Sequence, residues 1–199
     1  MYAGAAFMLL QALVCGFFLF TVRGWPIIAI GIPSVYLSYG YTGGPVPLAY
    51  RGLGELFVIL FFGFVAVMGT IFVQTGFWPW QGWISGLQIG CLSAVLIAVN
   101  NYRDLEEDRA ANKRTLVVRW GRRPVTFLIY FMTILPSFLV LTLQSFGYWF
   151  GASFILGLVF LLLELRLLQF DGVSSSLLGL SALHLILFVT AQHLCLTLT

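Results

Sequence analysis

Amide and acidic side chains recur at helical spacing in residues 100–121, whose sequence is NNYRDLEEDRAANKRTLVVRWG. Asn100, Asp104 and Asp108 are four residues apart, so a continuous helix would carry all three on one face. Two carboxylates one helical turn apart repel each other unless a positive charge lies between them. Magnesium meets this requirement, because it binds carboxylate oxygens while keeping water or phosphate oxygens as its other ligands. The spacing therefore predicts a Mg²⁺ site formed by Asp104 and Asp108.

A basic cluster follows the acidic pair. Lys113, Arg114 and Arg119 supply cationic donors that suit phosphate oxygens. An acidic pair followed by basic residues, at the mouth of an apolar bundle, suits a metal-bound diphosphate that carries a hydrophobic tail. The alternative is a solvated surface loop, with ion pairs such as Glu106–Arg109 that stabilise a helix by roughly a few tenths of a kcal/mol.

Two adjacent amides, Asn100 and Asn101, stand where the preceding apolar run ends. A polar group at the edge of the hydrocarbon region costs free energy unless it has hydrogen-bond partners, so such residues are functional candidates. The amides therefore favour the ligand-binding interpretation, in which they support the metal ligands or the substrate.

The elements that must position these residues are transmembrane helices. Hydrophobic residues make up 60% of the 199 positions and charged residues only 9%, which excludes a water-soluble domain with its usual share of about 25% charged residues. A helix needs about 20 apolar residues to cross the hydrocarbon core. The chain therefore predicts an all-α, polytopic transmembrane bundle of about seven helices. The apolar runs are residues 1–22, 25–41, 56–75, 83–99, 125–143, 147–163 and 176–198.

Almost all the charge lies in connections on one side of this bundle. If the runs alternate across the membrane, connections 42–55, 100–124 and 164–175 share a face with the N-terminus, and this face holds every acidic residue and every basic residue except Arg23. The positive-inside rule makes this face cytoplasmic. Within it, we expect Glu55, Glu164 and Asp171 to be isolated from the acidic pair. We expect Glu164 to extend toward the interface beside Arg166.

A stripe of small residues runs along the fourth apolar run. Small residues at a spacing of four let a neighbouring helix approach closely in lipid. The stripe therefore predicts a close helix–helix contact and not a ligand site. Its members are Gly82, Gly86, Gly90, Ala94 and Ala98.

The motif in residues 100–121, N-N-x-R-D-x-x-x-D-R-x-x-x-K-R-T-L-V-V-R-x-G, resembles the second aspartate-rich motif of the UbiA superfamily of intramembrane prenyltransferases. The paired asparagines and the K-R-T-L-V-V-R ending are most similar to the 1,4-dihydroxy-2-naphthoate prenyltransferases of menaquinone and phylloquinone biosynthesis. The segment YTGGPVPLAYRGLGEL in residues 41–56, followed by FFGFVAVMG, resembles a loop and the next helix of the same branch. The resemblance covers essentially the whole chain.

This resemblance implies a Mg²⁺-dependent enzyme that transfers a polyprenyl chain from a prenyl diphosphate to an aromatic acceptor of the naphthoate type. Asp104 and Asp108 would be its catalytic, metal-binding residues. The apolar bundle would hold the isoprenoid tail within the membrane lipid, and no nucleic-acid partner is expected. The implied substrate-binding residues are Asn100, Asn101, Arg103, Lys113, Arg114, Arg119, Tyr41 and Arg51.

The chain departs from the family in one respect. Superfamily members have about nine transmembrane helices and two aspartate-rich motifs, whereas this chain has one such motif. We therefore expect a single prenyltransferase-like domain over residues 1–199, truncated at its N-terminus relative to the family, in the cytoplasmic membrane or a plastid membrane. The alternatives are a non-catalytic remnant that binds isoprenoid or quinone, and another UbiA-type prenyltransferase. A transporter is a third alternative, which the lack of charge in the middle of any apolar run argues against.

Overall fold

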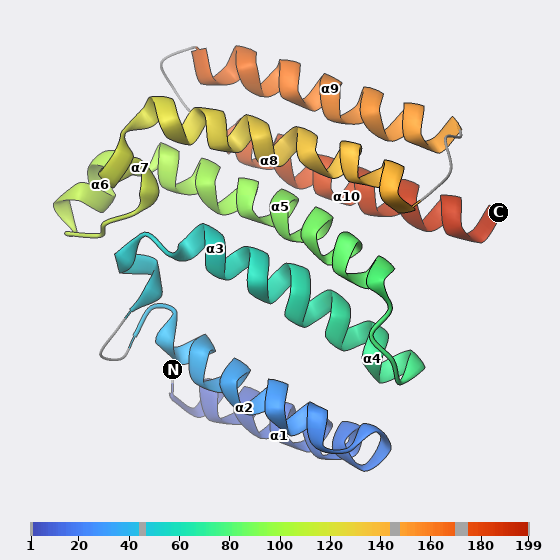
Figure 1. Cartoon of the computed structure of the whole chain (residues 1–199). Coiled ribbons are helices and arrows are strands. Elements are labelled where there is room, and N and C mark those ends of the chain that lie inside the picture. The colour runs from blue at the N-terminus through green and yellow to red at the C-terminus, as the bar shows by residue number, and fades with distance from the viewer. Residues whose placement is uncertain (1, 44–46, 144–147, 170–174, 199) are drawn as a thin grey trace.

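The computed structural model describes residues 2–43, 47–143, 148–169 and 175–198, and these ranges are helical apart from short connections and contain no β-strand. Each of the seven predicted apolar runs lies on a helix, so the all-α prediction is confirmed (Figure 1). The long helices are α1 (Tyr2–Arg23), α2 (Trp25–Gly40), the continuous helix of α3 (Gly54–Val58), η2 (Ile59–Met68) and α4 (Gly69–Thr75), then α5 (Trp80–Arg103), α8 (Arg122–Leu143), α9 (Tyr148–Gln169) and α10 (Ser175–Leu198). The short elements η1 (Leu48–Arg51), α6 (Leu105–Ala110) and α7 (Leu116–Trp120) lie in the connections.

Five of these helical segments are long and apolar enough to cross a membrane. A span of 21 residues, such as Arg122–Thr142 of α8, measures about 32 Å at 1.5 Å per residue, which matches a hydrocarbon core of about 30 Å. Helices α2, with 16 residues, and α9, with 22 residues, lie beside them in the bundle. The chain is therefore an integral membrane protein. The five spans are Ala6–Arg23, Gly54–Thr75, Trp80–Arg103, Arg122–Thr142 and Ser176–His193.

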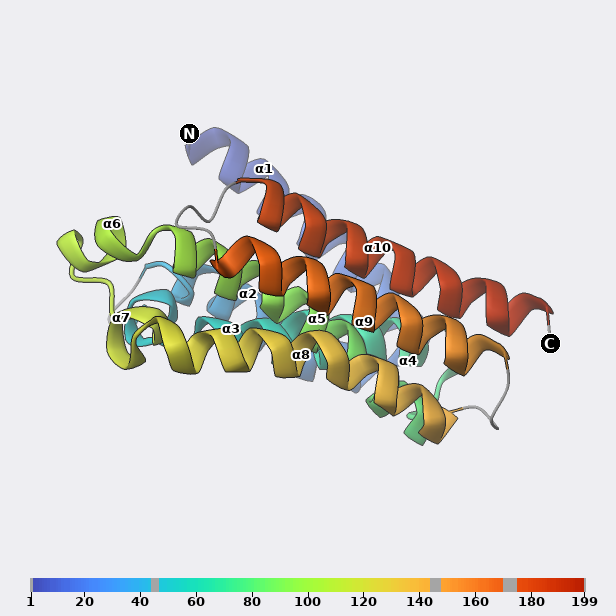
Figure 2. The same ribbon diagram turned by 90° about the horizontal axis from the view of Figure 1, so that it is seen from above.

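Helix α5 lies at the centre of the bundle. It contacts α3 and η2 on one side and α8 and α10 on the other (Figures 1 and 2). Its spanning segment is 61% buried, whereas that of α1 is 0% buried. Helices α1 and α2 pair with each other at the edge of the molecule, and α1 also contacts α4. Because α5 is enclosed by its neighbours, the polar residues at its end are held by several helices at once.

The small-residue stripe on α5 forms the close helix contact that the sequence predicts. A Cβ atom on Gly90 would lie 2.9 Å from the Ile59 carbonyl oxygen and 3.2 Å from the Gly63 Cα atom. A Cβ atom on Gly63 would overlap the Gly86 carbonyl oxygen. The facing residues, Ile59–Met68, have the wider turns of a π-helix, whose glycine rests directly on the stripe. This contact sets the distance between α5 and the continuous helix formed by α3, η2 and α4.

The predicted charged connections meet at one end of the bundle. Figure 1 shows the start of α3, the short helices α6 and α7, the start of α8 and the end of α9 together at this end. Asp171 lies outside the described residues. The helices alternate in direction, which brings the charged connections to this one end (Figure 1).

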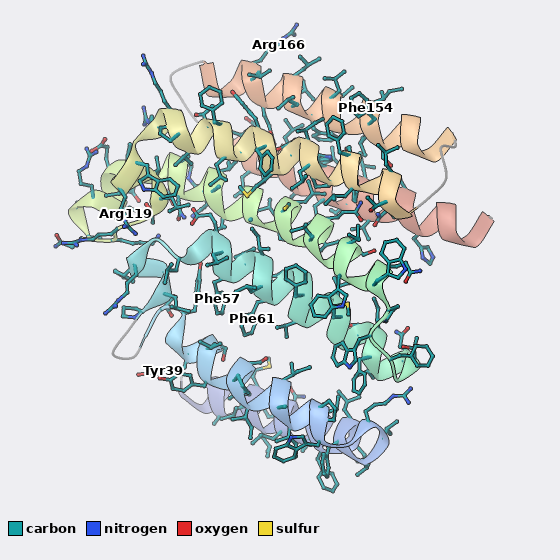
Figure 3. All side chains as sticks on the ribbon, in the orientation of Figure 1. Tyr39, Phe57, Phe61, Arg119, Phe154 and Arg166 are labelled. Atoms are coloured by element: carbon teal, nitrogen blue, oxygen red, sulfur yellow. The ribbon has the colours of Figure 1, made fainter. Side chains whose placement is uncertain are left out.

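The prediction that Glu164 extends toward the interface is wrong. Its side chain does not reach the interface but is fully buried, where Thr133 Oγ1 of α8 donates a hydrogen bond to Glu164 Oε2 over 2.7 Å. Ser181 Oγ of α10 lies 3.3 Å from Glu164 Oε1. Arg166, by contrast, is exposed (Figure 3). Two residues along a helix are about 200° apart, so Glu164 and Arg166 face opposite sides of α9.

Candidate active site

The helix that carries the acidic motif is broken at Asp104, so the predicted continuous helix is wrong. Helix α5 ends at Arg103, Asp104 adopts φ −88° and ψ 18°, and the separate helix α6 begins at Leu105. Backbone hydrogen bonds from Asp104 N to Asn100 O (3.0 Å) and from Asp108 N to Asp104 O (2.8 Å) continue across the break. The three polar residues of the motif therefore remain one turn apart, while the chain changes direction between them.

Asp104 lies in a hydrogen-bonded group at the end of α5. Arg103 Nε donates to Asp104 Oδ1 over 2.6 Å, and Asn100 Nδ2 donates to Asp104 Oδ2 over 3.2 Å. Arg103 also donates to Asn100 Oδ1 over 2.9 Å, which closes the group. The hydrogen bond from Arg103 is the largest cause that holds the pKa of Asp104 below its ordinary value. The carboxylate is about one-quarter exposed, so it remains ionised and accessible to a ligand.

Asp108 is buried and forms an ion pair with Lys113. Lys113 Nζ lies 3.0 Å from Asp108 Oδ1, and the Lys113 backbone N–H donates to the Asp108 carbonyl oxygen over 2.8 Å. The chain returns to Asp108 because Asn112, just after α6, adopts a left-handed conformation with φ 56°. The short helix and this turn thus place the first residue of the basic cluster beside Asp108.

The prediction that Glu55 is isolated from the acidic pair is wrong, because Glu55 lies at this site. Its carboxyl group is 4% exposed, and Asn101 Nδ2 donates to Glu55 Oε1 over 3.0 Å. Both Lys113 and Asp108 lie within electrostatic range of it. The available signal was its place at the start of a charge-free span on the same face as the acidic motif. Asn101 follows Glu55 by 46 positions, so spacing along the chain gave no sign of their contact.

Tyr41 also lies at this site. It follows α2, and its backbone carbonyl accepts a hydrogen bond from Ala49 N over 2.9 Å. Its hydroxyl oxygen is 3.4 Å from the position that a Cβ atom on Gly54 would take. Burial, followed by the negative charge of Glu55, raises the pKa of the Tyr41 hydroxyl above its ordinary value. The hydroxyl therefore stays protonated and can donate a hydrogen bond.

The two charged connections pack against each other through hydrogen bonds to backbone carbonyl groups. Arg114 N donates to Tyr50 O over 3.0 Å, and Arg119 donates to the Arg51 carbonyl oxygen over 3.2 Å. Gly52 adopts φ 71°, and a Cβ atom there would lie 2.7 Å from the Arg114 carbonyl oxygen. The side chains of Arg51, Arg114 and Arg119 are exposed at the charged end, where Figure 3 shows Arg119. The structure thus brings these arginines to the rim, while Lys113 and Asp108 lie deeper.

The metal that the motif predicts fits the oxygen chemistry of the site. Four buried side-chain oxygens have no hydrogen-bond partner: Glu55 Oε2, Asn101 Oδ1, Asp108 Oδ2 and Thr115 Oγ1. Within the described residues, no three His, Cys, Asp or Glu side chains gather closely enough to enclose a metal ion. Mg²⁺ does not need such a cage, since it is usually bound by one or two carboxylates together with water and substrate phosphates.

Comparisons with known proteins agree with the motif. Residues 2–196 match the family model described as the UbiA prenyltransferase family. The chain is 42% identical over 95 residues to a 1,4-dihydroxy-2-naphthoate octaprenyltransferase of Mycobacterium tuberculosis, a match that covers 48% of this chain and 32% of the relative. It is 32% identical over 118 residues to the Bacillus subtilis protein of the same name (59% and 38% covered), and 28% identical over 101 residues to a 2-carboxy-1,4-naphthoquinone phytyltransferase of Synechocystis (51% and 33% covered). The matches thus span less than half the length of these relatives, and no solved structure matches the chain.

Proposed function

The chain belongs to the UbiA prenyltransferase family, as its motif predicts, and we propose that it forms a prenyltransferase domain of quinone biosynthesis. In this proposal a polyprenyl chain passes from its diphosphate to 1,4-dihydroxy-2-naphthoate in a Mg²⁺-dependent reaction. The observation that carries the proposal is the meeting of Asp104, Asp108 and Lys113 at one end of an apolar bundle. The names of the relatives, which include octaprenyl and phytyl transferases acting on naphthoates, support the choice of acceptor.

The charged end would bind the diphosphate. Asp104 and Asp108 would hold Mg²⁺, which when bound supplies positive charge to the departing diphosphate. Lys113, together with the exposed arginines of the rim, would donate hydrogen bonds to the diphosphate oxygens. The bond between the allylic carbon and the diphosphate oxygen breaks, and its electron pair leaves with the diphosphate. The ring carbon that bears the carboxylate then attacks the allylic carbon. The bond to the carboxylate breaks, CO₂ leaves, and the electron pair of that bond restores the aromatic ring.

An apolar path from this end supports binding of the isoprenoid tail. The ring of Phe57 stacks on that of Phe61 with 4.4 Å between centroids, and on the other side lies 5.0 Å from the Tyr41 ring. Figure 3 shows Phe57 and Phe61 on the side of their helix that faces α2. Val65 and Gly69 continue this spacing of four residues along the same helix. Both line a cavity of about 440 Å³ between this helix and the α1–α2 pair. A tail that runs along this stripe would be shielded from water, as a cation-like allylic carbon requires.

The charge distribution supports an orientation in the membrane. Because nine of the ten basic residues lie in connections at the charged end, the positive-inside rule favours a cytoplasmic position for that end and for the N-terminus. We propose the cytoplasmic membrane as the location, where the diphosphate and the naphthoate would enter from the cytoplasm.

The test is transfer of a labelled polyprenyl group to 1,4-dihydroxy-2-naphthoate by the purified chain in lipid vesicles. We expect product with Mg²⁺, none with a chelator, and at least a hundredfold loss of turnover in Asp108→Asn. Glu106→Gln is the matched control, since that carboxylate is 72% exposed on the same short helix and should retain full turnover. Full turnover in Asp108→Asn would refute the proposal. Binding of the prenyl diphosphate without any product would support the second candidate, an isoprenoid-binding protein.

A further inference from the structure

Three of the buried oxygens without partners lie on Glu55, Asn101 and Asp108, and the Glu55 carboxylate is within electrostatic range of Asp108. Asn101 joins Glu55 through the hydrogen bond from Nδ2 to Oε1, which leaves Asn101 Oδ1 and Glu55 Oε2 without partners. Asp108 Oδ2 is the third, on the carboxylate whose other oxygen binds Lys113. Glu55, Asn101 and Asp108 are 4%, 3% and 7% exposed, so water cannot readily supply the missing hydrogen bonds. All three atoms are oxygens of the kind that bind a hard divalent cation.

The charges of this group are also unbalanced. Two buried carboxylates, those of Glu55 and Asp108, lie within electrostatic range of one ammonium group, that of Lys113. Among the described residues, the Lys113–Asp108 contact is the one ion pair that either carboxylate forms. Buried charges in proteins are normally paired or bound to a metal. With both carboxylates ionised, this group carries one more negative charge than positive charge.

Asp104 does not share this property. Both of its oxygens have partners, since Oδ1 binds Arg103 and Oδ2 binds Arg103 and Asn100. The motif thus separates into an outer carboxylate whose two oxygens both have partners and an inner one, Asp108, with one oxygen that has none. Asp108 lies within electrostatic range of a residue from another helix, Glu55 at the start of α3.

We propose that Glu55 is a metal ligand of the site, and that its carboxylate and that of Asp108 bind one divalent cation with the Asn101 carbonyl oxygen. The inference rests on the proposed function, because it concerns the cation that the proposed reaction uses. Glu55, Asp108 and Asn101 would leave the remaining octahedral positions of Mg²⁺ for Asp104, water and diphosphate oxygens. Glu55 thereby joins the α3 helix to the chemistry at the end of α5, and no part of the aspartate-rich motif includes it.

The test measures cation binding directly and not only turnover. Mn²⁺ replaces Mg²⁺ as the probe, and electron paramagnetic resonance of free Mn²⁺ gives its affinity for the purified full chain, alone and with inorganic pyrophosphate. Glu55→Gln is the decisive variant, because the glutamine Oε1 can still accept the Asn101 hydrogen bond while the charge is lost. We expect Mn²⁺ to bind at least tenfold more weakly to Glu55→Gln, and Glu55→Asp to restore most of the affinity. Glu106→Gln is the control and should bind Mn²⁺ as the unmodified chain does.

The outcomes separate the inference from the proposed function. Unchanged Mn²⁺ affinity in a folded Glu55→Gln chain would overturn the inference, and would reduce Glu55 to a hydrogen-bond acceptor that holds α3 against α5. If Asp108→Asn then still lost both Mn²⁺ and prenyl transfer, the proposed function would stand without Glu55. If Mn²⁺ binding depended on Glu55 but no prenyl group reached the naphthoate, the cation site would stand and the proposed reaction would fall. Absence of Mn²⁺ binding by the unmodified chain, with pyrophosphate present, would overturn the inference as well.

Discussion

The contact between Gly90 of α5 and the facing π-helical segment offers a sharp test of the packing. In Gly90→Ala, the new Cβ atom would lie 2.9 Å from the Ile59 carbonyl oxygen and 3.1 Å from the Ile59 Cα atom. Both are backbone atoms, so the two helices must separate by several tenths of an ångström. Overpacking of this kind costs about 1–3 kcal/mol. The change from glycine to alanine also stabilises a helix by about 1 kcal/mol, which would hide part of this cost.

A matched control removes the second effect. Gly69 lies at the start of α4 in helical conformation, and a Cβ atom there would meet nothing within 4 Å. Gly69→Ala therefore gains helix propensity without a clash, and the difference between the two variants isolates the packing cost of about 1–3 kcal/mol. For a chain of this size, that difference corresponds to about 2–12 °C in Tm. Thermal unfolding of the detergent-solubilised variants, followed by circular dichroism, measures it.

The result that would refute the reasoning is equal stability of the two variants. The helices would then be free to move apart. The contact would not set the distance between α5 and the continuous helix formed by α3, η2 and α4. A lower Tm in Gly90→Ala predicts a second effect, because the same two helices carry Glu55 and Asn101, whose side chains are 3.0 Å apart. We expect this variant to bind Mn²⁺ more weakly than Gly69→Ala.

Three further predictions concern single side chains. Arg103→Gln should raise the pKa of Asp104 toward its ordinary value of about 3.9, because the hydrogen bond from Arg103 is the largest cause of its depression; the carboxyl ¹³C chemical shift reports this titration. In the unmodified chain the stability contributed by ionised Asp104 is present above the pKa of the unfolded state and is lost as pH falls through the lower folded pKa, so the variant should lose it at a higher pH. Glu164→Ala should lower the free energy of unfolding by about 2–5 kcal/mol, since it leaves the buried Thr133 hydroxyl without its acceptor and opens a cavity. Glu164→Gln, which keeps an acceptor, should cost less, and equal Tm values for the two variants would contradict this. Phe61→Ala removes the ring that stacks on Phe57 and should raise the KM for a long prenyl diphosphate more than for a short one, and equal increases would argue against the proposed tail path.

The glycine stripe shows which features of the helix packing can be predicted from the sequence. The spacing of four residues along α5 predicts that a helix will approach closely, and the contacts of Gly86 and Gly90 confirm it. The identity of the partner could not be predicted, because any of the apolar helices could face a row of glycines. Hydropathy records that a face is apolar and not which neighbour covers it.

The candidate site likewise has a part that the sequence predicts and a part that it does not. Asp104, Asp108 and Lys113 lie within ten positions of one another, so their local spacing was enough to predict that they meet at one end of the bundle. Even there, the break of the helix at Asp104 and the left-handed turn at Asn112 depend on backbone conformation that residue types do not specify.

What the sequence by itself determined is the number and extent of the apolar helices, their all-α class, the gathering of charge at one end and the family, since these follow from composition and from spacing along the chain. What only the tertiary structure decided is which carboxylates are buried, and beside which partners. Glu55 and Glu164 both stand near the ends of apolar runs, yet one joins Asn101 of α5 and the other Thr133 of α8. The physical reason is that helix rotation and helix pairing are set by the packing of whole faces in lipid, where a shift of one residue turns a side chain by about 100° and moves it from an interface to the surface.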